Sequence, residues 1–410
     1  MWTRLLDRMA RRLIRRGRLT LTYPDGTVRV YGPGGGACAA MEIRTARALR
    51  ALCIDPELAL GEGYMNETIV IGGAQPLEDL LRLLLRNRRP DAFPRSVRAL
   101  DRVRYHARAV IQRNSALTAR ANVAHHYDLS DDLYRLMLDG DMQYSCAYFA
   151  RPGMTLDEAQ LAKKRLIARK LLIEKDMHVL DIGCGWGGLA MTLAGEFGAR
   201  VTGVTLSDNQ LATAQARIRE AGLEDRITLR LLDYRALNDR FDRIVSVGML
   251  EHVGLPQYET YFQKLGDLLD ADGVALIHTI GRSAPPMPHS AWINRYIFPG
   301  GYVPSLSELL PALERSGLWQ SDIEVWRLHY AYTLRAWRDR FEANVDTVLD
   351  WYDARFVRMW RYYLTACILS FEEMAQCVYQ LQLAHKRDAV PLTRDYLYDP
   401  GTTARRHAAE

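Results

Sequence analysis

A glycine-rich turn directly after a short apolar run constrains the fold of this chain more than any other feature. The apolar run is VLDI, residues 179–182, and the turn is GCGWGG, residues 183–188. Glycines in such a turn allow a sharp reversal and a close approach of the backbone to a ligand, and a helix is expected to begin at about Gly188. The segment therefore predicts a strand, a ligand-binding turn and a helix.

The same alternation of apolar runs and helix-length segments continues along the chain. Short apolar runs are found at residues 178–182, 200–205, 227–232, 241–247 and 274–279. Buried runs of this length, separated by segments that can form crossover helices, are typical of a parallel sheet. The sequence predicts a doubly wound α/β domain whose ligand lies at the carboxyl ends of the strands.

The glycines alone fit two kinds of cofactor. Gly183, Gly185 and Gly188 match the dinucleotide pattern G-x-G-x-x-G, whereas Gly183, Gly185 and Gly187 match the G-x-G-x-G of S-adenosylmethionine enzymes. Asp181 stands before the first glycine, and the acidic residue that a nicotinamide site needs about 20 positions later is missing. These neighbours favour S-adenosylmethionine over a nicotinamide cofactor.

A methyltransferase domain predicts further cofactor contacts at the ends of the second and third strands. Asp233 can accept a hydrogen bond from the adenine amino group, and Tyr234 can cover the adenine ring. Thr205 and Gln210 can contact the ribose or the adenine. The alternative for Asp233 is that its carboxylate caps the start of a helix.

The length of 410 residues exceeds the roughly 250–300 residues of a single core, so about two domains are expected. We place a boundary near residue 120, between an amino-terminal lipid-binding and membrane-binding domain with its connector (1–120) and a catalytic domain (121–410). In the first part the sequence predicts a β-hairpin at 19–31 and a helix at 77–85. The Arg-rich, Pro-containing stretch 87–114 is interpreted as the connector.

Charge is unevenly distributed between these parts. Residues 1–120 contain 22 arginines, no lysine and 11 acidic residues, a balance of +11, whereas the whole chain carries +5. Within 2–18, one helical stripe is apolar and the other positions carry seven arginines. Such a helix can lie on a membrane of anionic lipids, or it can pack on its own domain. Nucleic acid is not expected as a partner, because no recognition motif is found.

The remaining composition indicates a cytoplasmic protein. The amino terminus has no apolar signal-peptide core, and no apolar run reaches the roughly 20 residues that span a bilayer. Six cysteines are scattered without the spacing of metal ligands or a disulfide framework, so free thiols and no metal are expected.

The chain resembles the cyclopropane-fatty-acyl-phospholipid synthases, a family that includes the mycolic acid cyclopropane synthases. The resemblance depends on segments that follow in order through most of residues 120–340: HHYDLSDDLYRLMLD (125–139), MQYSCAYF (142–149), VLDIGCGWGGLA (179–190), VTGVTLSDNQ (201–210), LLDYRAL (231–237), FDRIVSVGMLEHVG (241–254), LIHTIG (276–281), WINRYIFPGGYVPS (292–305) and HYAYTLRAW (329–337). Residues 1–120 match less sharply, chiefly at GEGYM (61–65).

This resemblance implies a class I methyltransferase sheet and a smaller, mainly helical amino-terminal domain that handles lipid. It implies methylene transfer from S-adenosylmethionine to a cis double bond of membrane phospholipids, through methyl transfer, a carbocation and deprotonation assisted by bicarbonate. A homodimer at the inner face of the cell membrane is implied as well. The implied cofactor residues, besides Asp181, are Tyr144, Ser145, Gly183, Gly185, Thr205, Gln210, Asp233 and Tyr234. The implied catalytic residues, around bicarbonate, are Cys146, Glu251, His278, Ile280 through its backbone, and Tyr330.

Several alternatives stay open at this point. The same fold and cofactor can give a methyl-branched or methylene-modified acyl chain. Two further alternatives are a non-catalytic lipid-binding protein and a nicotinamide-linked oxidoreductase. Departures from the family pattern, Asn66 and the Pro-rich stretch 284–288, concern lipid selectivity. Cys146 can be a nucleophile or a wall of the anion site. An alkene offers no electrophile to a thiolate, so we favour the wall.

Overall fold

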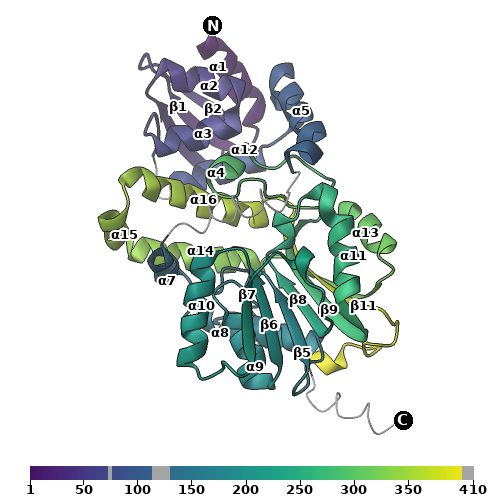
Figure 1. The fold of residues 1–410 in the computed structure, drawn as a ribbon. Coiled ribbons are helices and arrows are strands. Elements are labelled where there is room, and N and C mark those ends of the chain that lie inside the picture. Colours follow the sequence, from purple (N-terminus) through teal and green to yellow (C-terminus); the bar gives the residue numbers. More distant parts are fainter. Residues whose placement is uncertain (73–75, 113–129, 399–410) are drawn as a thin grey trace. The chain divides into compact units, whose positions relative to one another are not determined.

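The computed structural model describes residues 1–72, 76–112 and 130–398, which form two compact units (Figure 1). Unit 1 comprises Met1–Ile111, Met287–Pro299 and Leu334–Gln376, and unit 2 comprises Gln112–Pro286, Gly300–Thr333 and Cys377–Glu410. Unit 1 thus takes in two stretches from the second half of the chain. The boundary predicted near residue 120 lies outside the described residues, and the division into 1–120 and 121–410 stays a prediction.

Unit 1 contains a four-stranded sheet of order β2-β1-β3-β4. Its strands are β1 (Gly17–Thr22), β2 (Val28–Gly34), β3 (Cys38–Ile43) and β4 (Ile69–Gly72). The predicted hairpin is confirmed, because β1 and β2 pair antiparallel with Thr22 opposite Val28. At its turn Gly26 has a φ of +79°, in the left-handed region that glycine adopts without strain.

Four described helices pack on this sheet: α1 (Trp2–Leu13), α2 (Ala46–Ile54), α3 (Pro56–Met65) and α4 (Pro76–Arg86). The other described helices of unit 1 are α5 (Arg95–Ile111), α12 (Ala291–Tyr296), α15 (Val345–Trp351), α16 (Ala354–Glu372) and the later part of α14 (His329–Ala343). The predicted helix at 77–85 is confirmed by α4. The stretch interpreted as a connector, 87–114, is largely the helix α5 of unit 1 within its described part.

The apolar stripe of α1 packs on unit 1. Leu6 and Met9 are buried, and so is Ile14 directly after the helix. Asp7 ties the helix to the hairpin, since its carboxylate pairs with Arg29 at 2.7 Å and accepts a hydrogen bond from Tyr31 at 2.8 Å. The buried side chains of this stripe therefore pack on their own domain, which is the second of the two alternatives given for residues 2–18.

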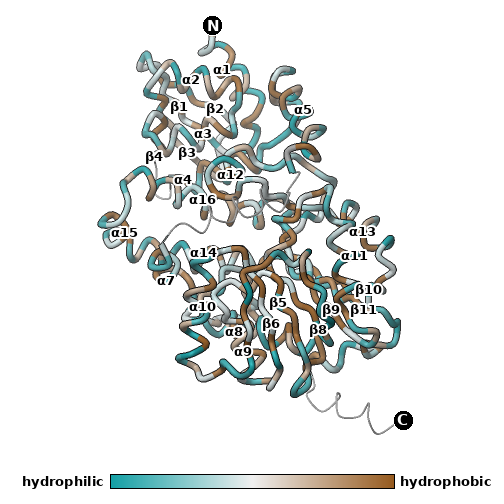
Figure 2. The backbone as a smooth tube through the Cα atoms, in the orientation of Figure 1, coloured by the Kyte–Doolittle hydropathy of each residue, from teal (hydrophilic) through white to brown (hydrophobic). Residues whose placement is uncertain are grey.

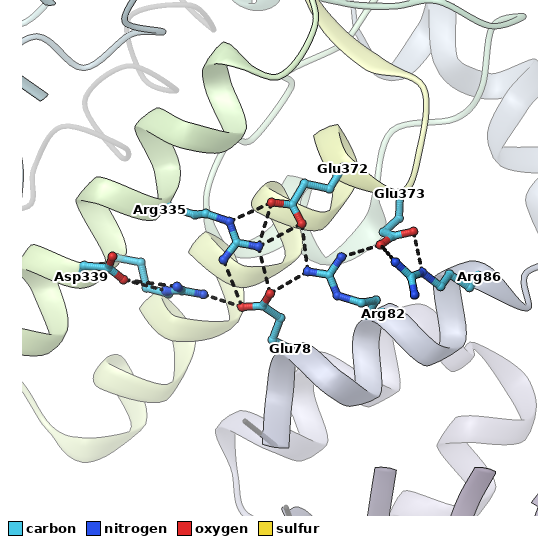
Figure 3. A network of polar contacts seen from close by, with 8 residues as sticks. Glu78, Arg82, Arg86, Arg335, Asp339, Glu372 and Glu373 are labelled. Carbon is cyan, nitrogen blue, oxygen red and sulfur yellow. Dashed lines mark hydrogen bonds and ion pairs between the residues drawn. The ribbon is translucent and has the colours of Figure 1, made fainter. Parts of the chain in front are cut away.

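Unit 1 also contains a network of ion pairs that joins α4, α14 and α16 (Figure 3). The carboxylate of Glu78 accepts hydrogen bonds from Arg82 at 2.6 Å, Arg335 at 2.9 Å and Arg338 at 2.6 Å. Arg335 and Arg82 also reach Glu372, at 2.7 and 2.9 Å. Burial raises the pKa of Glu78, but the three arginines outweigh it and lower that pKa to about 2.

Unit 2 is built on a seven-stranded sheet of order β10-β11-β9-β8-β5-β6-β7. Its strands are β5 (His178–Ile182), β6 (Arg200–Thr205), β7 (Ile227–Leu231), β8 (Phe241–Val247), β9 (Leu269–Arg282), β10 (Trp319–Trp326) and β11 (Gln376–Ala384). The first five are the predicted strands, and they pair in parallel, whereas β10 and β11 pair antiparallel. The strand order reverses at β5, which lies between β6 and β8.

Helices cover both faces of this sheet, which confirms the doubly wound class (Figure 1). They are α7 (Asp131–Met137), α8 (Leu156–Lys170), α9 (Gly188–Phe197), α10 (Asp208–Glu220), α11 (Tyr258–Leu268) and α13 (Leu306–Arg315). Successive strand residues alternate between two cores: Val179 packs with α8 and α9, and Leu180 packs with α11 and α13. Figure 2 shows apolar residues concentrated along the central strands. In the described part of the chain, no helix is long and apolar enough to span a membrane.

Candidate functional site

The glycine turn between β5 and α9 has the backbone geometry that only glycine adopts readily. Gly183, Gly185 and Gly187 have φ values of +83°, +54° and +81°. The N–H of Gly183 donates to the carbonyl of Val204 at 2.9 Å, which fixes the turn against the end of β6. Any other residue at these three positions would have to adopt a positive φ, which residues with a Cβ rarely do.

A pocket opens at the carboxyl ends of the parallel strands, where the strand order reverses. All nine predicted cofactor residues line it: Tyr144, Ser145, Asp181, Gly183, Gly185, Thr205, Gln210, Asp233 and Tyr234. Lining residues that the sequence reasoning missed include Gln143, Trp186, Arg235 and His252. Trp186 lies inside the glycine turn itself, so its place in the motif was the available signal.

Asp181 supplies a buried acceptor to this pocket. Its side chain is nearly inaccessible, and its Oδ2 atom has no hydrogen-bond partner among the described residues. Burial raises the pKa of Asp181 to about 7, although the nearby ammonium of Lys163 opposes this shift. A ligand cation or N–H donor would satisfy the oxygen, so the pocket fits the amino group of an amino-acid-containing cofactor.

Two pairs of side chains line the pocket near the carboxyl ends of β6 and β7. Thr205 Oγ1 donates to Gln210 Oε1 at 3.1 Å, so both predicted contacts lie together after β6. Asp233 caps the short 3-10 helix at 234–236 and also pairs with the guanidinium of Arg235 at 2.6 Å. The capping alternative for Asp233 is therefore correct in this structure, and it leaves the residue in the pocket wall.

Glu251 is the buried carboxyl next to the pocket. It lies in a 3-10 turn after β8, between Met249 and His252, which both line the pocket. Its Oε1 atom accepts a hydrogen bond from the N–H of Ile280 at 2.6 Å, and its Oε2 atom has no partner among the described residues. Burial raises the pKa of Glu251 to about 7. The two predicted residues Glu251 and Ile280 are thus in direct contact.

His278 lies two residues before Ile280 on β9 and is also buried. Its Nδ1 atom pairs with the amide nitrogen of Gln380 on β11 at 3.0 Å. With that amide donating, the imidazole proton is on Nε2, which has no partner among the described residues. Burial, together with Lys163 and Lys170, lowers the pKa of His278 well below its usual value, so the ring is neutral.

Cys146 and Tyr330 lie in segments that are bonded to each other. The N–H of Ala147 donates to Thr333 Oγ1 at 3.0 Å, and the N–H of Phe149 donates to His329 Nδ1 at 3.1 Å. These bonds hold the loop that carries Cys146 against the first turn of α14, which carries Tyr330. Burial raises the pKa of the Cys146 thiol far above its usual range.

The site therefore has two parts in the described structure. The predicted cofactor residues line one open pocket. The five predicted catalytic residues are not among the residues that line it: Cys146, Glu251, His278 and Tyr330 are buried, and Ile280 is partly buried. Two buried polar atoms of the second part, Glu251 Oε2 and His278 Nε2, have no hydrogen-bond partner among the described residues. Buried polar atoms are nearly always hydrogen-bonded, so a bound ligand or water is expected at each of them. Gln380, which orients His278, was missed because a single glutamine in a strand carries no motif.

Comparison with known proteins assigns the chain to a family. A family model described as mycolic acid cyclopropane synthetase matches residues 114–381, and one described as a domain of unknown function matches residues 7–92. Cyclopropane-fatty-acyl-phospholipid synthase of Escherichia coli strain K12 is 39% identical over 338 residues, which are 82% of this chain and 85% of that protein. Tuberculostearic acid methyltransferase of Mycobacterium tuberculosis is 34% identical over 400 residues, 92% of this chain and 90% of that protein.

Solved structures confirm the class I methyltransferase fold of unit 2. Cyclopropane synthase MmaA2 of Mycobacterium tuberculosis has a TM-score of 0.61 at 34% identity, covering 65% of this chain and 98% of that chain. Mycolic acid cyclopropane synthase CmaA1, solved with SAH and CTAB, has a TM-score of 0.62 at 35% identity, covering 64% and 97%. The chain therefore belongs to the cyclopropane-fatty-acyl-phospholipid synthase family of S-adenosylmethionine-dependent transferases, which includes the mycolic acid cyclopropane synthases.

Proposed function

We propose that this enzyme transfers a methylene group from S-adenosylmethionine to the cis double bond of unsaturated acyl chains in membrane phospholipids, which forms cyclopropane fatty acyl chains. The observation that carries the proposal is the pair of unpartnered buried atoms, Glu251 Oε2 and His278 Nε2, next to a pocket lined by the nine predicted cofactor residues. Ring formation needs a base that removes a proton from the transferred methyl group, and a small anion held near these two atoms would be such a base.

The pocket residues would hold S-adenosylmethionine by its three chemical parts. Asp181 suits the amino group, Thr205 and Gln210 suit the ribose or adenine, and Asp233 with Tyr234 suits the adenine. When bound, S-adenosylmethionine supplies an electrophilic methyl group. An alkene is a poor nucleophile, so the contribution of the chain is to hold the reactants aligned in a site that excludes water.

The buried residues would hold bicarbonate, which when bound supplies a base small enough for this site. The neutral His278 offers the Nε2 proton, and Glu251 in its protonated form offers a proton on Oε2, because Oε1 is already occupied by Ile280 N–H. With a pKa of about 7, Glu251 is protonated in a large share of molecules at neutral pH. We propose that Tyr330 and the Cys146 loop complete this site, with Cys146 as a wall and not as a nucleophile.

A methyl-branched or methylene-modified acyl product is the second candidate. One observation favours it: a relative that matches 92% of this chain is named a tuberculostearic acid methyltransferase. The two products share the cofactor, the lipid and the carbocation, and differ in which proton leaves or whether the cation is reduced. The two candidates are distinguished by analysis of the product lipid.

We also propose that the enzyme is cytoplasmic, acts as a homodimer and associates peripherally with anionic lipids at the inner face of the cell membrane. The support comes from α1 and the residues after it, where the seven arginines between residues 4 and 18 are all exposed. Cations at a surface gain about 1 kcal/mol each near an anionic leaflet. The apolar side chains of the helix are partly used in packing, so this is electrostatic attachment more than insertion.

The test is to incubate the purified protein with S-adenosylmethionine and vesicles of unsaturated phospholipid, and then to analyse the acyl chains by mass spectrometry. Cyclopropanation adds one CH2 unit and makes the acyl chain resistant to reagents that cleave double bonds. An acyl chain that gains CH2 and stays cleavable identifies a methylene product or a branched alkene, and one that gains CH4 and resists cleavage identifies a reduced methyl branch. No mass change on any unsaturated phospholipid would contradict the proposed function.

A further inference from the structure

The helix α8 holds the wall of the cofactor pocket through two side chains one turn apart. Lys163 Nζ donates to Ser145 Oγ at 2.8 Å and to Gln143 Oε1 at 2.8 Å. Gln160 Nε2 donates to the backbone carbonyls of the same two residues, at 3.2 Å for Gln143 and 2.9 Å for Ser145. Gln143 and Ser145 line the pocket, whereas Lys163 is fully buried behind them.

A buried lysine without a full counter-charge is costly and needs an explanation. Among the described residues the ammonium forms no ion pair with a carboxylate, and its two hydrogen-bond partners are the neutral Gln143 and Ser145. Titratable groups face it from the preceding loop, from β5 and β9 and from α8 itself: Asp139, Cys146, Asp181, His278 and Lys164. Burial lowers the pKa of Lys163 to about 8, against the pull of Asp139. The lysine is thus a cation at neutral pH and loses its charge in mildly alkaline solution.

The direction of these hydrogen bonds sets the polarity of the pocket wall. An ammonium only donates, so Ser145 Oγ and Gln143 Oε1 must act as acceptors toward Lys163. The hydroxyl proton of Ser145 then points away from the lysine. The amide nitrogen of Gln143 donates one hydrogen to the carbonyl of Asp141 at 3.5 Å and keeps a second hydrogen for another acceptor. The lysine thereby makes this wall a set of donors with a positive charge behind them, and Asp181 is an acceptor in the same pocket.

We propose that Lys163 is a positioning residue for the carboxylate of the amino-acid part of S-adenosylmethionine, acting through Ser145 and Gln143. The proposal rests on S-adenosylmethionine as the cofactor. Donors backed by a cation suit a carboxylate, and the unpartnered oxygen of Asp181 suits the neighbouring ammonium of the same zwitterion. Lys163 does not touch the ligand, so its effect reaches only the amino-acid part of the cofactor.

The test compares two ligands and two lysines by calorimetry on the full chain. S-adenosylhomocysteine has the amino-acid part, and methylthioadenosine lacks it. Lys163→Met should weaken S-adenosylhomocysteine roughly 10- to 100-fold, the range for losing a charge-assisted hydrogen bond, and should leave methylthioadenosine within about twofold. The matched control is Lys170→Met, since Lys170 is equally buried on α8 but pairs with Glu324 and does not touch the pocket wall. It should keep the affinity for both ligands.

The pH dependence gives a second readout that a merely structural lysine would not produce. The unaltered protein should lose affinity for S-adenosylhomocysteine as pH rises through about 8, because the Lys163 ammonium is then deprotonated. The ligand's own amino group titrates alike with every variant, so the difference from Lys163→Met reports the lysine together with its effect on the neighbouring Asp181. If Lys163→Met loses affinity equally for both ligands, or keeps its affinity for S-adenosylhomocysteine, the proposal is overturned.

A variant that retains the lysine guards against misfolding. Ser145→Ala removes the donor that Lys163 orients, and it should weaken S-adenosylhomocysteine by about tenfold while sparing methylthioadenosine. If Lys163→Met does not fold, this variant decides the question: unchanged affinity for S-adenosylhomocysteine rejects the proposal. If the unaltered protein binds neither ligand, the cofactor assignment fails instead.

Discussion

Glu251 shows at the residue scale how burial and one backbone hydrogen bond prepare a carboxyl group for chemistry. Burial raises its pKa from an ordinary 4.5 to about 7, and Ile280 N–H fixes one oxygen. The other oxygen is left unpartnered among the described residues, close in sequence to Met249 and His252 of the pocket. A group held in this way can present either an acceptor or a proton near neutral pH.

The variant Glu251→Gln should reduce turnover by about 1,000-fold, because an amide can donate a hydrogen bond but can neither release a proton nor carry the charge of the carboxylate. Affinity for S-adenosylhomocysteine should change less than about threefold, since Glu251 is not among the residues lining the cofactor pocket. Initial rates and calorimetry measure the two effects. The control is Glu259→Gln, an exposed carboxylate paired with Arg315, which should retain activity. Substantial activity in Glu251→Gln would remove this residue from the catalytic site.

The variant Cys146→Ser should lower kcat by about tenfold without abolishing turnover. Burial keeps the thiol protonated, so it is a poor nucleophile, and serine preserves most of its volume. The expected loss comes from placing a more polar group in a fully buried position. A completely inactive but folded Cys146→Ser enzyme would restore the nucleophile as an explanation.

Sequence reasoning could place seven of the nine predicted cofactor residues because they lie at the ends of predicted strands, whereas Tyr144 and Ser145 followed from the family resemblance alone. Asp181, Gly183 and Gly185 were predictable from the glycine turn alone. Lys163 and Gln380 were not, because a single lysine in a helix or a single glutamine in a strand looks like an ordinary surface residue. Their roles depend on contacts across 18 and 102 residues of the chain, which only the folded structure brings together.

At the scale of elements, four of the five parallel strands were predictable as mostly buried apolar runs, and the edge strand β7 was predictable from its apolar residues although only Ile227 in it is buried. The antiparallel pair β10 and β11 was missed: β10 is mostly polar in sequence, and β11 follows the long helix α16 of unit 1. The return of 287–299 and 334–376 to unit 1 was also not predictable. A periodic pattern indicates which residues of a helix are buried, but it does not indicate which other element the helix packs against.

The variant Glu78→Ala should destabilise unit 1 by about 2 kcal/mol, since it leaves three arginines without a shared carboxylate in a mostly buried place. The pKa of Glu78 is lowered in the folded state, from 4.5 to about 2. Its contribution is therefore present above pH 4.5 and is lost as the pH falls toward 2. Chemical unfolding at several pH values measures this difference.

The control for Glu78 is Glu67→Ala, which removes a more exposed carboxylate of unit 1 that pairs with Arg358 at 3.4 Å. Surface pairs of this kind contribute about 0–1 kcal/mol, so this variant should remain close to the unaltered protein. Equal stability of Glu78→Ala and Glu67→Ala at neutral pH would show that the network in Figure 3 contributes little to the folded state.

At the scale of the whole molecule, charge divides the chain into a basic first part and an acidic remainder, with +11 in residues 1–120 and +5 overall. Deleting residues 2–18 would remove buried side chains such as Leu6 and Met9 together with the arginines, and would disturb β1. Substitution of exposed arginines is therefore the cleaner way to separate membrane attachment from folding.

The triple variant Arg8→Gln, Arg12→Gln and Arg15→Gln should bind vesicles of anionic phospholipid about 100-fold more weakly at low salt, at about 1 kcal/mol for each arginine. The difference should shrink at high salt, because mobile ions screen surface charge. Sedimentation with vesicles measures it. The control removes three exposed arginines of unit 2 in the same way, at positions 151, 219 and 387. If both triple variants lose binding equally, attachment is a matter of net charge and not of the amino-terminal segment.

The central claim is that this enzyme builds a cyclopropane ring on a phospholipid acyl chain. The most direct measurement is NMR of phospholipid isolated after reaction with S-adenosylmethionine that carries a carbon label in its methyl group. Ring formation places the label in a ring CH2, with its protons at unusually high field and the alkene signals lost. Label recovered in a methyl branch or an exocyclic methylene group, or no label in lipid at all, would contradict it.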